Sequence, residues 1–199
     1  MTHTTLEGLG LPLVHASGGL DAAGLRPVTD RHGQSVRAWV RSLDGVQKEG
    51  GTLSSPTGRA WRFASDEGAH LGGRDVAPNP LSYVGVGMAA SFMTELRALA
   101  GLRGIELHDP VLTLENFYFR DCSFPRGTMV SGALPPEVSL ACRCTAAADV
   151  LHRLLLDAVA AAPVNRLARD EKISLFTLTH NGRQIAPTEV TPVAWGDTV

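Results

Sequence analysis

The sequence predicts an α+β fold in which one long buried helix packs on a sheet that is mostly antiparallel. Three observations carry this prediction. Residues 79–104 form a nearly uncharged stretch with helical periodicity, residues 36–41 alternate between apolar and polar side chains, and residues 146–162 form a second, Ala-rich helical stretch. Alternating segments on both sides of the long helix supply further strands.

Length, charge and composition limit the classes to which the protein can belong. The chain has 199 residues, 44% of them hydrophobic, which suits a single domain with a sizeable core. A net charge of -2 with both signs interspersed gives no basic stripe for nucleic acid. No cationic start precedes an apolar run, and no apolar run is long enough to span a membrane. We therefore expect a cytoplasmic protein that binds neither nucleic acid nor membrane, with its three cysteines reduced.

The first part of the chain is expected to contribute an arm and two strands. Residues 1–33 are rich in Gly, Thr, His and Asp without a sustained period, which predicts a mostly irregular arm. The alternation over residues 34–41 predicts a half-buried strand, and Asp44-Gly45 a tight turn. After a loose Gly-rich segment, residues 59–64 predict a second strand.

The long helix has a clear start signal and an apolar stripe. A turn-rich loop over residues 65–78 leads to Asn79, which is suited to cap the helix, and Pro80 suits its first turn. Apolar residues then recur at helical spacing: Val84, Met88, Phe92, Leu96, Leu99 and Leu102. Because small residues cover much of the remaining surface and the first charge is Glu95, we expect the N-terminal half in the core.

The segment after the long helix predicts two strands, a helix and a short helical piece. Residues 111–119 and 137–144 alternate as strands, with a loop or wide hairpin tip between them. Thr145 is a candidate N-cap for the helix over residues 146–162. Pro163 breaks or kinks that helix, and a short helical piece follows.

A closing hairpin and a tail complete the predicted organisation. A strand is expected over residues 173–180, and Asn181-Gly182 predicts a tight turn into a short return strand. Residues 191–199 are expected to form a loose tail. The main domain is thus placed at residues 34–190.

Two stretches resemble the OsmC/Ohr family of peroxide reductases. Residues 65–104, SDEGAHLGGRDVAPNPLSYVGVGMAASFMTELRALAGLRG, resemble the family's acidic strand end, GG-x-D loop, Pro-x-Pro helix start and small-residue helix. Residues 138–167, VSLACRCTAAADVLHRLLLDAVAAAPVNRL, are similar to its strand and helix ending in Cys-Pro-Val. The resemblance covers roughly residues 34–180. It implies an intertwined homodimer with the long helices packed together and active sites at the subunit interface.

The residues that carry the family's chemistry differ in this sequence. The resemblance places Ser91 at the position of the reactive cysteine and Ala162 at that of its partner. Leu81 and Ser82 stand where the organic-hydroperoxide branch has a carboxylate. A serine hydroxyl provides neither a thiolate at neutral pH nor a sulfur that forms a disulfide. Peroxidase activity by the family mechanism is therefore not expected.

The remaining cysteines allow a weaker alternative. Val138, Leu140, Cys142 and Cys144 share one face of the predicted strand, whereas Cys122 lies in the preceding loop. A Cys-x-Cys pair can bind a soft metal or cycle through a strained disulfide, with His152 or His108 as an extra ligand. Spacing supplies no complete ligand set, so small apolar core residues are the favoured interpretation and neither metal nor cofactor is predicted.

A pocket without the redox thiols is the remaining candidate site. Met88, Phe92 and the space left by Ser91 and Ala162 suit a small apolar or aromatic ligand. No G-x-S-x-G motif surrounds Ser91, so it is interpreted as a small helix residue rather than a nucleophile. Polar candidates lie in the loop before the helix: His70 and Glu67 as acid/base groups, Arg74 as a ligand contact, and Asp66 and Asp75. A solvated loop with local salt bridges is the simpler interpretation of these residues.

Two functional classes follow. The first is an OsmC-like homodimer repurposed as a non-redox enzyme acting on a small organic metabolite. The alternative is a small-ligand-binding or structural OsmC-like protein without turnover, and a third hypothesis is a hydroperoxide reductase that uses Cys142 and Cys144. An enzyme requires a titratable group with a perturbed pKa in the pocket, whereas a binding protein requires only apolar walls and an anchor.

Overall fold

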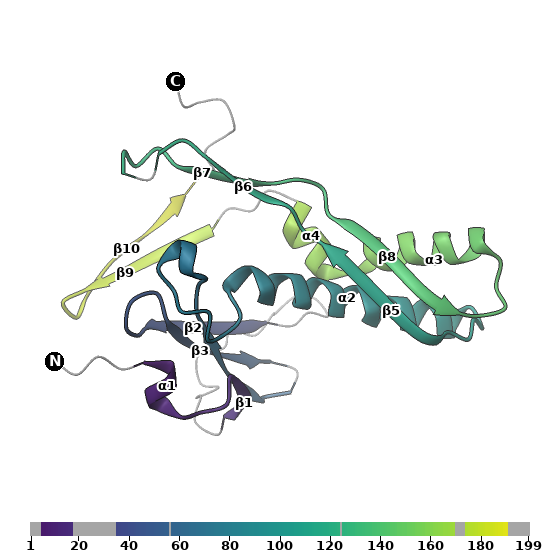
Figure 1. Cartoon of the computed structure of the whole chain (residues 1–199), viewed down its shortest axis with the longest axis horizontal. Coiled ribbons are helices and arrows are strands. Elements are labelled where there is room, and N and C mark those ends of the chain that lie inside the picture. The colour runs from purple at the N-terminus through teal and green to yellow at the C-terminus, as the bar shows by residue number, and fades with distance from the viewer. Residues whose placement is uncertain (1–4, 18–34, 56, 124, 170–173, 191–199) are drawn as a thin grey trace. The chain divides into compact units, whose positions relative to one another are not determined.

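The protein contains the predicted combination of helices and antiparallel strands. The computed structural model describes residues 5–17, 35–55, 57–123, 125–169 and 174–190. The chain divides into two compact units, Met1–Val84 and Gly85–Val199 (Figure 1). Every strand pair in the described residues is antiparallel, so the predicted α+β class is confirmed.

The first unit contains a four-stranded antiparallel sheet. Its order is β1-β4-β3-β2, formed by β1 (Val14–Ser17), β4 (Ala60–Ser65), β3 (Lys48–Ser54) and β2 (Val36–Ser42). The predicted turn at Asp44-Gly45 joins β2 to β3, with Gly45 at a φ of 57°. Helix α1 (Leu6–Leu9), capped by the Thr5 side chain, and strand β1 lie within the segment 1–33 that was predicted to be mostly irregular. Residues 1–4 and 18–33 of that segment lie outside the described residues.

Two sequence predictions about this sheet were wrong. The Gly-rich segment expected to be loose is part of β3, where Gly50 and Gly51 are buried. A Cβ at Gly50 would lie 2.8 Å from the Trp39 carbonyl oxygen, so the close approach of β2 favours glycine there. The second error concerns β2, which is exposed along its whole length rather than half-buried, because it is the edge strand of the sheet.

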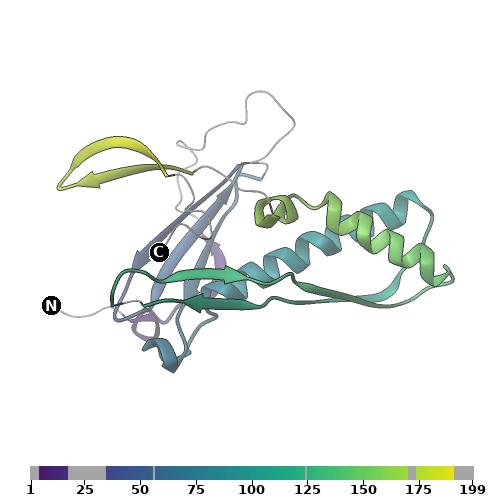
Figure 2. The same ribbon diagram turned by 90° about the horizontal axis from the view of Figure 1, so that it is seen from above.

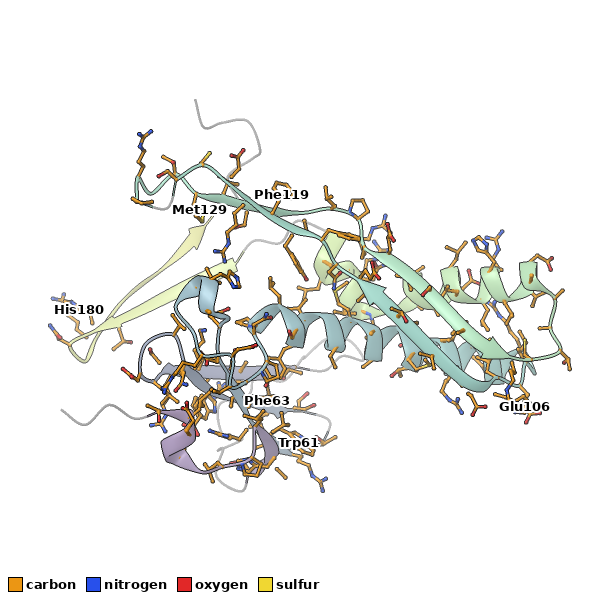
Figure 3. The ribbon with its side chains drawn as sticks, in the orientation of Figure 1. Trp61, Phe63, Glu106, Phe119, Met129 and His180 are labelled. Carbon is orange, nitrogen blue, oxygen red and sulfur yellow. The ribbon has the colours of Figure 1, made fainter. Side chains whose placement is uncertain are left out.

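The sheet buries one face of β4. Ala60, Arg62 and Ala64 are buried, whereas the alternate residues Trp61 and Phe63 lie on the opposite face (Figure 3). The core of this unit is small: Leu6, Ala64 and Ala77 are buried together, with Leu43 and Val76 packed against them.

Helix α2 (Pro80–Leu102) begins as the sequence predicts, because the Asn79 side chain accepts a hydrogen bond from the Ser82 N–H at 2.9 Å. Its buried residues are Met88, Phe92, Leu96 and Ala100, a single stripe at a spacing of four. The expectation that the N-terminal half lies in the core was wrong. Apolar side chains of that half, including Val84 and Val86, are exposed, since other elements cover only one stripe of the helix.

The second unit is built on one long β-hairpin. Strand β5 (His108–Glu115) pairs with β8 (Glu137–Arg143), and β6 (Tyr118–Asp121) pairs with β7 (Val130–Ala133). The Leu134 N–H donates to the Phe117 carbonyl at 2.9 Å, which joins the two ladders into a continuous ribbon (Figures 1 and 2). Of the two alternatives predicted for residues 120–136, a loop or a wide hairpin tip, the structure contains the hairpin, with its tip between β6 and β7.

The helices and the closing hairpin follow β8. Helix α3 (Ala148–Ala161) begins after Ala147, so the predicted Thr145 cap was wrong and no side chain caps the helix. Pro163 starts helix α4 (Pro163–Arg169), as a proline at a first helical position can. Strands β9 (Ser174–His180) and β10 (Arg183–Val190) are joined at Asn181-Gly182, both at positive φ, as the sequence predicts. Residues 191–199 of the predicted tail lie outside the described residues.

Two buried clusters hold the second unit together. In the first, Leu96 and Ala100 of α2 pack with Leu154 and Ala158 of α3. In the second, Met88 and Phe92 of α2 pack with Ala162, and strands β5 and β8 contribute partly buried side chains to it. Successive turns of one helical stripe thus serve both clusters.

A glycine substitution in the loop before α2 tests this account of the backbone. A Cβ at Gly73 would lie 1.8 Å from the Glu67 carbonyl oxygen, so Gly73→Ala forces the loop to shift. We expect a destabilisation of about 1–3 kcal/mol, measured by urea unfolding. Gly101→Ala in α2 is the control: no atom lies within 4 Å of its Cβ, and we expect a stabilisation of about 0.5–1 kcal/mol. Equal stability of the Gly73 variant and the wild type would contradict the close contact.

Candidate functional site

A buried carboxylate organises the loop between β4 and α2. Asp66 is fully buried and accepts hydrogen bonds from the backbone N–H groups of Glu67 at 2.8 Å, Arg74 at 3.1 Å and Val76 at 3.3 Å. Burial by itself disfavours the ionised form, but the three N–H donors outweigh it and lower the pKa of Asp66. The side chain therefore supports the loop as an anion instead of serving as a proton donor.

The other polar candidates in this loop form local pairs. Glu67 lies 3.0 Å from the Lys48 ammonium, and Arg74 lies 3.2 Å from a carboxylate oxygen of Glu7. His70 is exposed in the 3-10 turn η1 (Ala69–Leu71), and Asp75 is exposed at a φ of 57°. These contacts match the simpler interpretation of the loop, a set of local salt bridges on the first unit.

A buried ion pair in the sheet was not predicted. The Arg62 Nε donates to Glu49 Oε1 at 2.9 Å, and Arg62 Nη1 donates to the Pro12 carbonyl at 2.7 Å. Arg41 Nε binds the other oxygen of Glu49 at 2.7 Å. Burial disfavours the charged form of Glu49, but the two guanidinium groups outweigh it and hold its pKa below the usual range. The only sequence signal was the position of Arg62 between Trp61 and Phe63, on the alternate face of a strand.

The apolar candidates come together in the second unit. Met88, Phe92 and Ala162 form one buried cluster, with Leu112, Leu114, Val138, Val159 and Val164 packed against it. The predicted proximity of the long helix to Ala162 is therefore present, but neighbouring side chains fill the space beside Ala162. Ser91 is partly buried on the same helix. His70, Glu67 and Arg74 belong to the first unit, whereas this cluster belongs to the second.

An open apolar groove lies between β8 and α3. Its volume is about 560 Å³. Most of its lining residues are apolar, and the polar ones are Ser139, Cys142 and His152. Cys142 is on the half-buried face of β8, whereas Ser139 is on the alternate face. The full lining is Pro136, Val138, Ser139, Leu140, Cys142, Ala148, Leu151, His152, Leu155, Leu156 and Val159. Val138 and Val159 also pack against the cluster of Met88, Phe92 and Ala162, so the groove and the cluster share a wall.

Sequence reasoning identified one wall of this groove and missed the other. The alternation Val138, Leu140, Cys142 was predicted as one face of a strand, and that face is the half-buried one. Leu151 and Leu155 of α3 were not singled out, although their spacing of four is typical of one helix face.

The cysteines occupy two different environments. Cys142 and Cys144 are half-buried, whereas Cys122 is exposed in the loop after β6. Burial, the charge of the Cys144 thiolate and a hydrogen bond with Cys144 raise the pKa of Cys142. The Cys144 Sγ lies 3.8 Å from the Ala146 carbonyl oxygen. No group of three or more potential ligands from His, Cys, Asp and Glu gathers within the described residues.

Comparisons with solved structures find hydroperoxide resistance proteins. An OsmC-like hydroperoxide resistance protein from Jannaschia sp. CCS1 is 16% identical, over 79% of this chain and 99% of that one, with a TM-score of 0.49. The organic hydroperoxide resistance protein OsmC from Legionella pneumophila is 19% identical, over 68% and 89%, with a TM-score of 0.49. OhrB of Bacillus subtilis is 18% identical, over 68% and 90%, with a TM-score of 0.44.

These structures belong to the class that the sequence motifs resemble. Neither a protein-family model nor a curated protein sequence matches the chain. Among the described residues, no helix is both long and apolar enough to cross a bilayer, and the cytoplasmic location stays a prediction.

Replacing the buried carboxylate tests its role in the loop. In Asp66→Asn, an amide N–H₂ group would face backbone N–H donors. We therefore expect the free energy of unfolding to fall by about 2 kcal/mol at pH 7. Because the fold lowers the pKa of Asp66, its contribution is present above the ordinary pKa of 3.8 and is lost as the pH falls through the folded value. Urea unfolding between pH 7 and pH 3 should therefore show the two proteins converging in stability at low pH. The control is Asp75→Asn, at an exposed residue of the same loop, whose stability should stay near that of the wild type at every pH. A stability difference between the Asp66 variant and the wild type that does not change with pH would contradict the assigned charge.

Proposed function

We propose that this protein binds a small neutral apolar or aromatic molecule in the groove between β8 and α3. The single observation that carries the proposal is the groove itself, which has a volume of about 560 Å³ and is lined mainly by apolar side chains of a strand and a helix. Small-molecule sites have volumes of roughly 300–1,000 Å³ and apolar linings with few polar groups. The groove meets both criteria.

The polar groups of the groove indicate the kind of molecule. Cys142 points to the groove side of β8, and His152 lines the groove from α3; both side chains are hydrogen-bonding groups. Among the described residues, the lining includes no Asp, Glu, Lys or Arg. A charged ligand would lose its hydration without an ionic partner. A neutral molecule with one hydroxyl or carbonyl group suits this lining.

Binding without turnover is the function that the chemistry of the site supports best. The raised pKa of Cys142 keeps its thiol protonated and thus a poor nucleophile. Glu67, one of the two predicted acid/base residues, is paired with Lys48. The repurposed enzyme that the sequence also predicts, with His70 and Glu67 in acid/base roles and Arg74 as a ligand contact, stays a prediction. So does a thiol-dependent peroxidase using Cys142 and Cys144.

A charge placed in the groove tests the proposal. Leu156 lines the groove and is 51% exposed, so Leu156→Glu adds a carboxylate with little cost to the fold. With the neutral fluorescent probe N-phenyl-1-naphthylamine, we expect saturable binding to the wild type and an affinity at least about tenfold lower for the variant, from the lost apolar contact and the added charge.

Val150→Glu is the matched control for this experiment. Val150 is 41% exposed on the same helix but is not among the residues that line the groove, so this variant should bind the probe like the wild type. Unchanged affinity in the Leu156 variant, or an equal loss in both variants, would refute the groove as the binding site.

We further propose that the protein is a homodimer that covers exposed apolar side chains of α2. The family resemblance implies paired long helices, and the structure leaves Leu81, Val84 and Val86 exposed on more than one side of this helix. Exposed apolar side chains that gather on one element are typical of interaction surfaces. A second copy presents the same helix, as the two-fold symmetry of a dimer requires.

A charge on α2 tests the dimer. Val86 is 70% exposed, and two Val86→Glu side chains brought together by the symmetry axis would repel each other. We expect this variant to elute as a monomer where the wild type is a dimer, with the molar mass measured by light scattering. Leu167→Glu on α4 starts from a side chain of nearly the same exposure, 69%, and should remain dimeric. A monomeric wild type or a dimeric Val86 variant would contradict the proposed dimer.

A further inference from the structure

Cys142 and Cys144 form a pair of thiols on one face of β8. Residues two apart on a strand point to the same side, and here that side is the half-buried one. The two thiols lie close enough to influence each other, since Cys144 contributes to the raised pKa of Cys142. The ladder between β5 and β8 is irregular beside them, since its register shifts between His108 and Val111. Such irregularities locally redirect a strand and its side chains.

The charged groups around the pair lie mainly on the other face of the hairpin. Arg143, between the two cysteines, points away from them and binds Asp109; both side chains are largely exposed. His108 lies opposite Arg143 in the ladder and is near Glu106 at 3.7 Å. From α3, the His152 imidazole faces the groove that Cys142 also lines. The thiol face itself therefore presents sulfur, one imidazole nearby and apolar side chains.

This donor set discriminates between metal ions. Calcium and magnesium require several oxygen ligands, which the thiol face does not offer. Structural zinc requires four ligands, and no group of three His, Cys, Asp or Glu side chains gathers in the described part of the chain. Copper(I) is a soft ion that thiolates select, and it accepts a linear pair of them. Two adjacent thiols with no third ligand thus match copper(I) among the common biological metals.

We propose that Cys142 and Cys144 bind a single copper(I) ion through their two sulfur atoms. On binding, the two S–H bonds break, two Cu–S bonds form, and two protons leave to solvent. Copper stays in the +1 state and no electron is transferred. The site carries one net negative charge, and its partial burial limits access of water and oxygen to the metal. Cys142 also lines the groove of the proposed small-molecule ligand, but the copper titration is carried out without that ligand.

The three cysteines of the chain allow a test with an internal control. The reduced full-length protein is titrated anaerobically with copper(I) in acetonitrile, in competition with the chromophoric chelator bathocuproine disulfonate. We expect one equivalent to bind to the wild type and to Cys122→Ser, whose thiol lies outside the pair. Cys142→Ser and Cys144→Ser should each lower the affinity at least a hundredfold, because a hydroxyl is a poor ligand for a soft ion.

Two further measurements strengthen the test. Because two protons are released, the apparent association constant should rise up to about 100-fold per pH unit while both thiols are protonated. X-ray absorption at the copper edge should show two sulfur neighbours. Retention of one equivalent by the Cys142/Cys144 double serine variant, loss of binding in Cys122→Ser, or three sulfur neighbours would overturn the proposal. Circular dichroism verifies the fold of each variant, and Cys144→Ala replaces Cys144→Ser if the latter does not fold.

Discussion

The burial of one stripe of helix α2 is the interaction on which the second unit depends. Met88 and Phe92 serve one cluster, and Leu96 and Ala100 serve the other, so a single helix links both clusters through residues four apart. In these two clusters, helix α3 and the hairpin of β5 and β8 pack on this stripe of α2. The groove lies between β8 and α3, two elements that both pack against α2.

The first unit depends more on polar than on apolar contacts. Its buried cluster contains only Leu6, Ala64 and Ala77, with two partly buried neighbours. Beside this small core, two buried carboxylates order the chain through hydrogen bonds and ion pairs. Asp66 fixes the loop before α2 through backbone N–H groups, and Glu49 joins strands β2 and β4 through Arg41 and Arg62. Removing one partner of such a pair costs more than the pair contributes, because the other charge is then buried alone.

Local signals in the sequence predicted most elements, and tertiary contacts explain the errors. The Asn79 cap, the Asn181-Gly182 turn and the alternation around Cys142 depend on near neighbours along the chain, and they were predicted correctly. Gly50 lies in a strand where the backbone of β2 approaches closely enough to favour glycine, which composition does not reveal. For the site, the residues Met88, Phe92 and Ala162 were rightly grouped, but whether neighbours fill the space between them depends on packing. The pairing of Glu67 with Lys48 joins elements that only the fold brings together.

The long hairpin of the second unit has a further consequence for its dynamics. Strands β5 and β8 supply Leu112, Leu114, Val138 and Leu140 to the two clusters, whereas the clusters named above include no residue of β6 or β7. A two-stranded ribbon without such packing is marginally stable on its own. The hairpin should therefore open from its tip toward its base, and its amide protons should exchange with solvent progressively more slowly from Asp121 toward Leu112. Local stability therefore decreases along the hairpin. The outer half, β6 and β7, opens while the inner half, β5 and β8, stays packed against the helices.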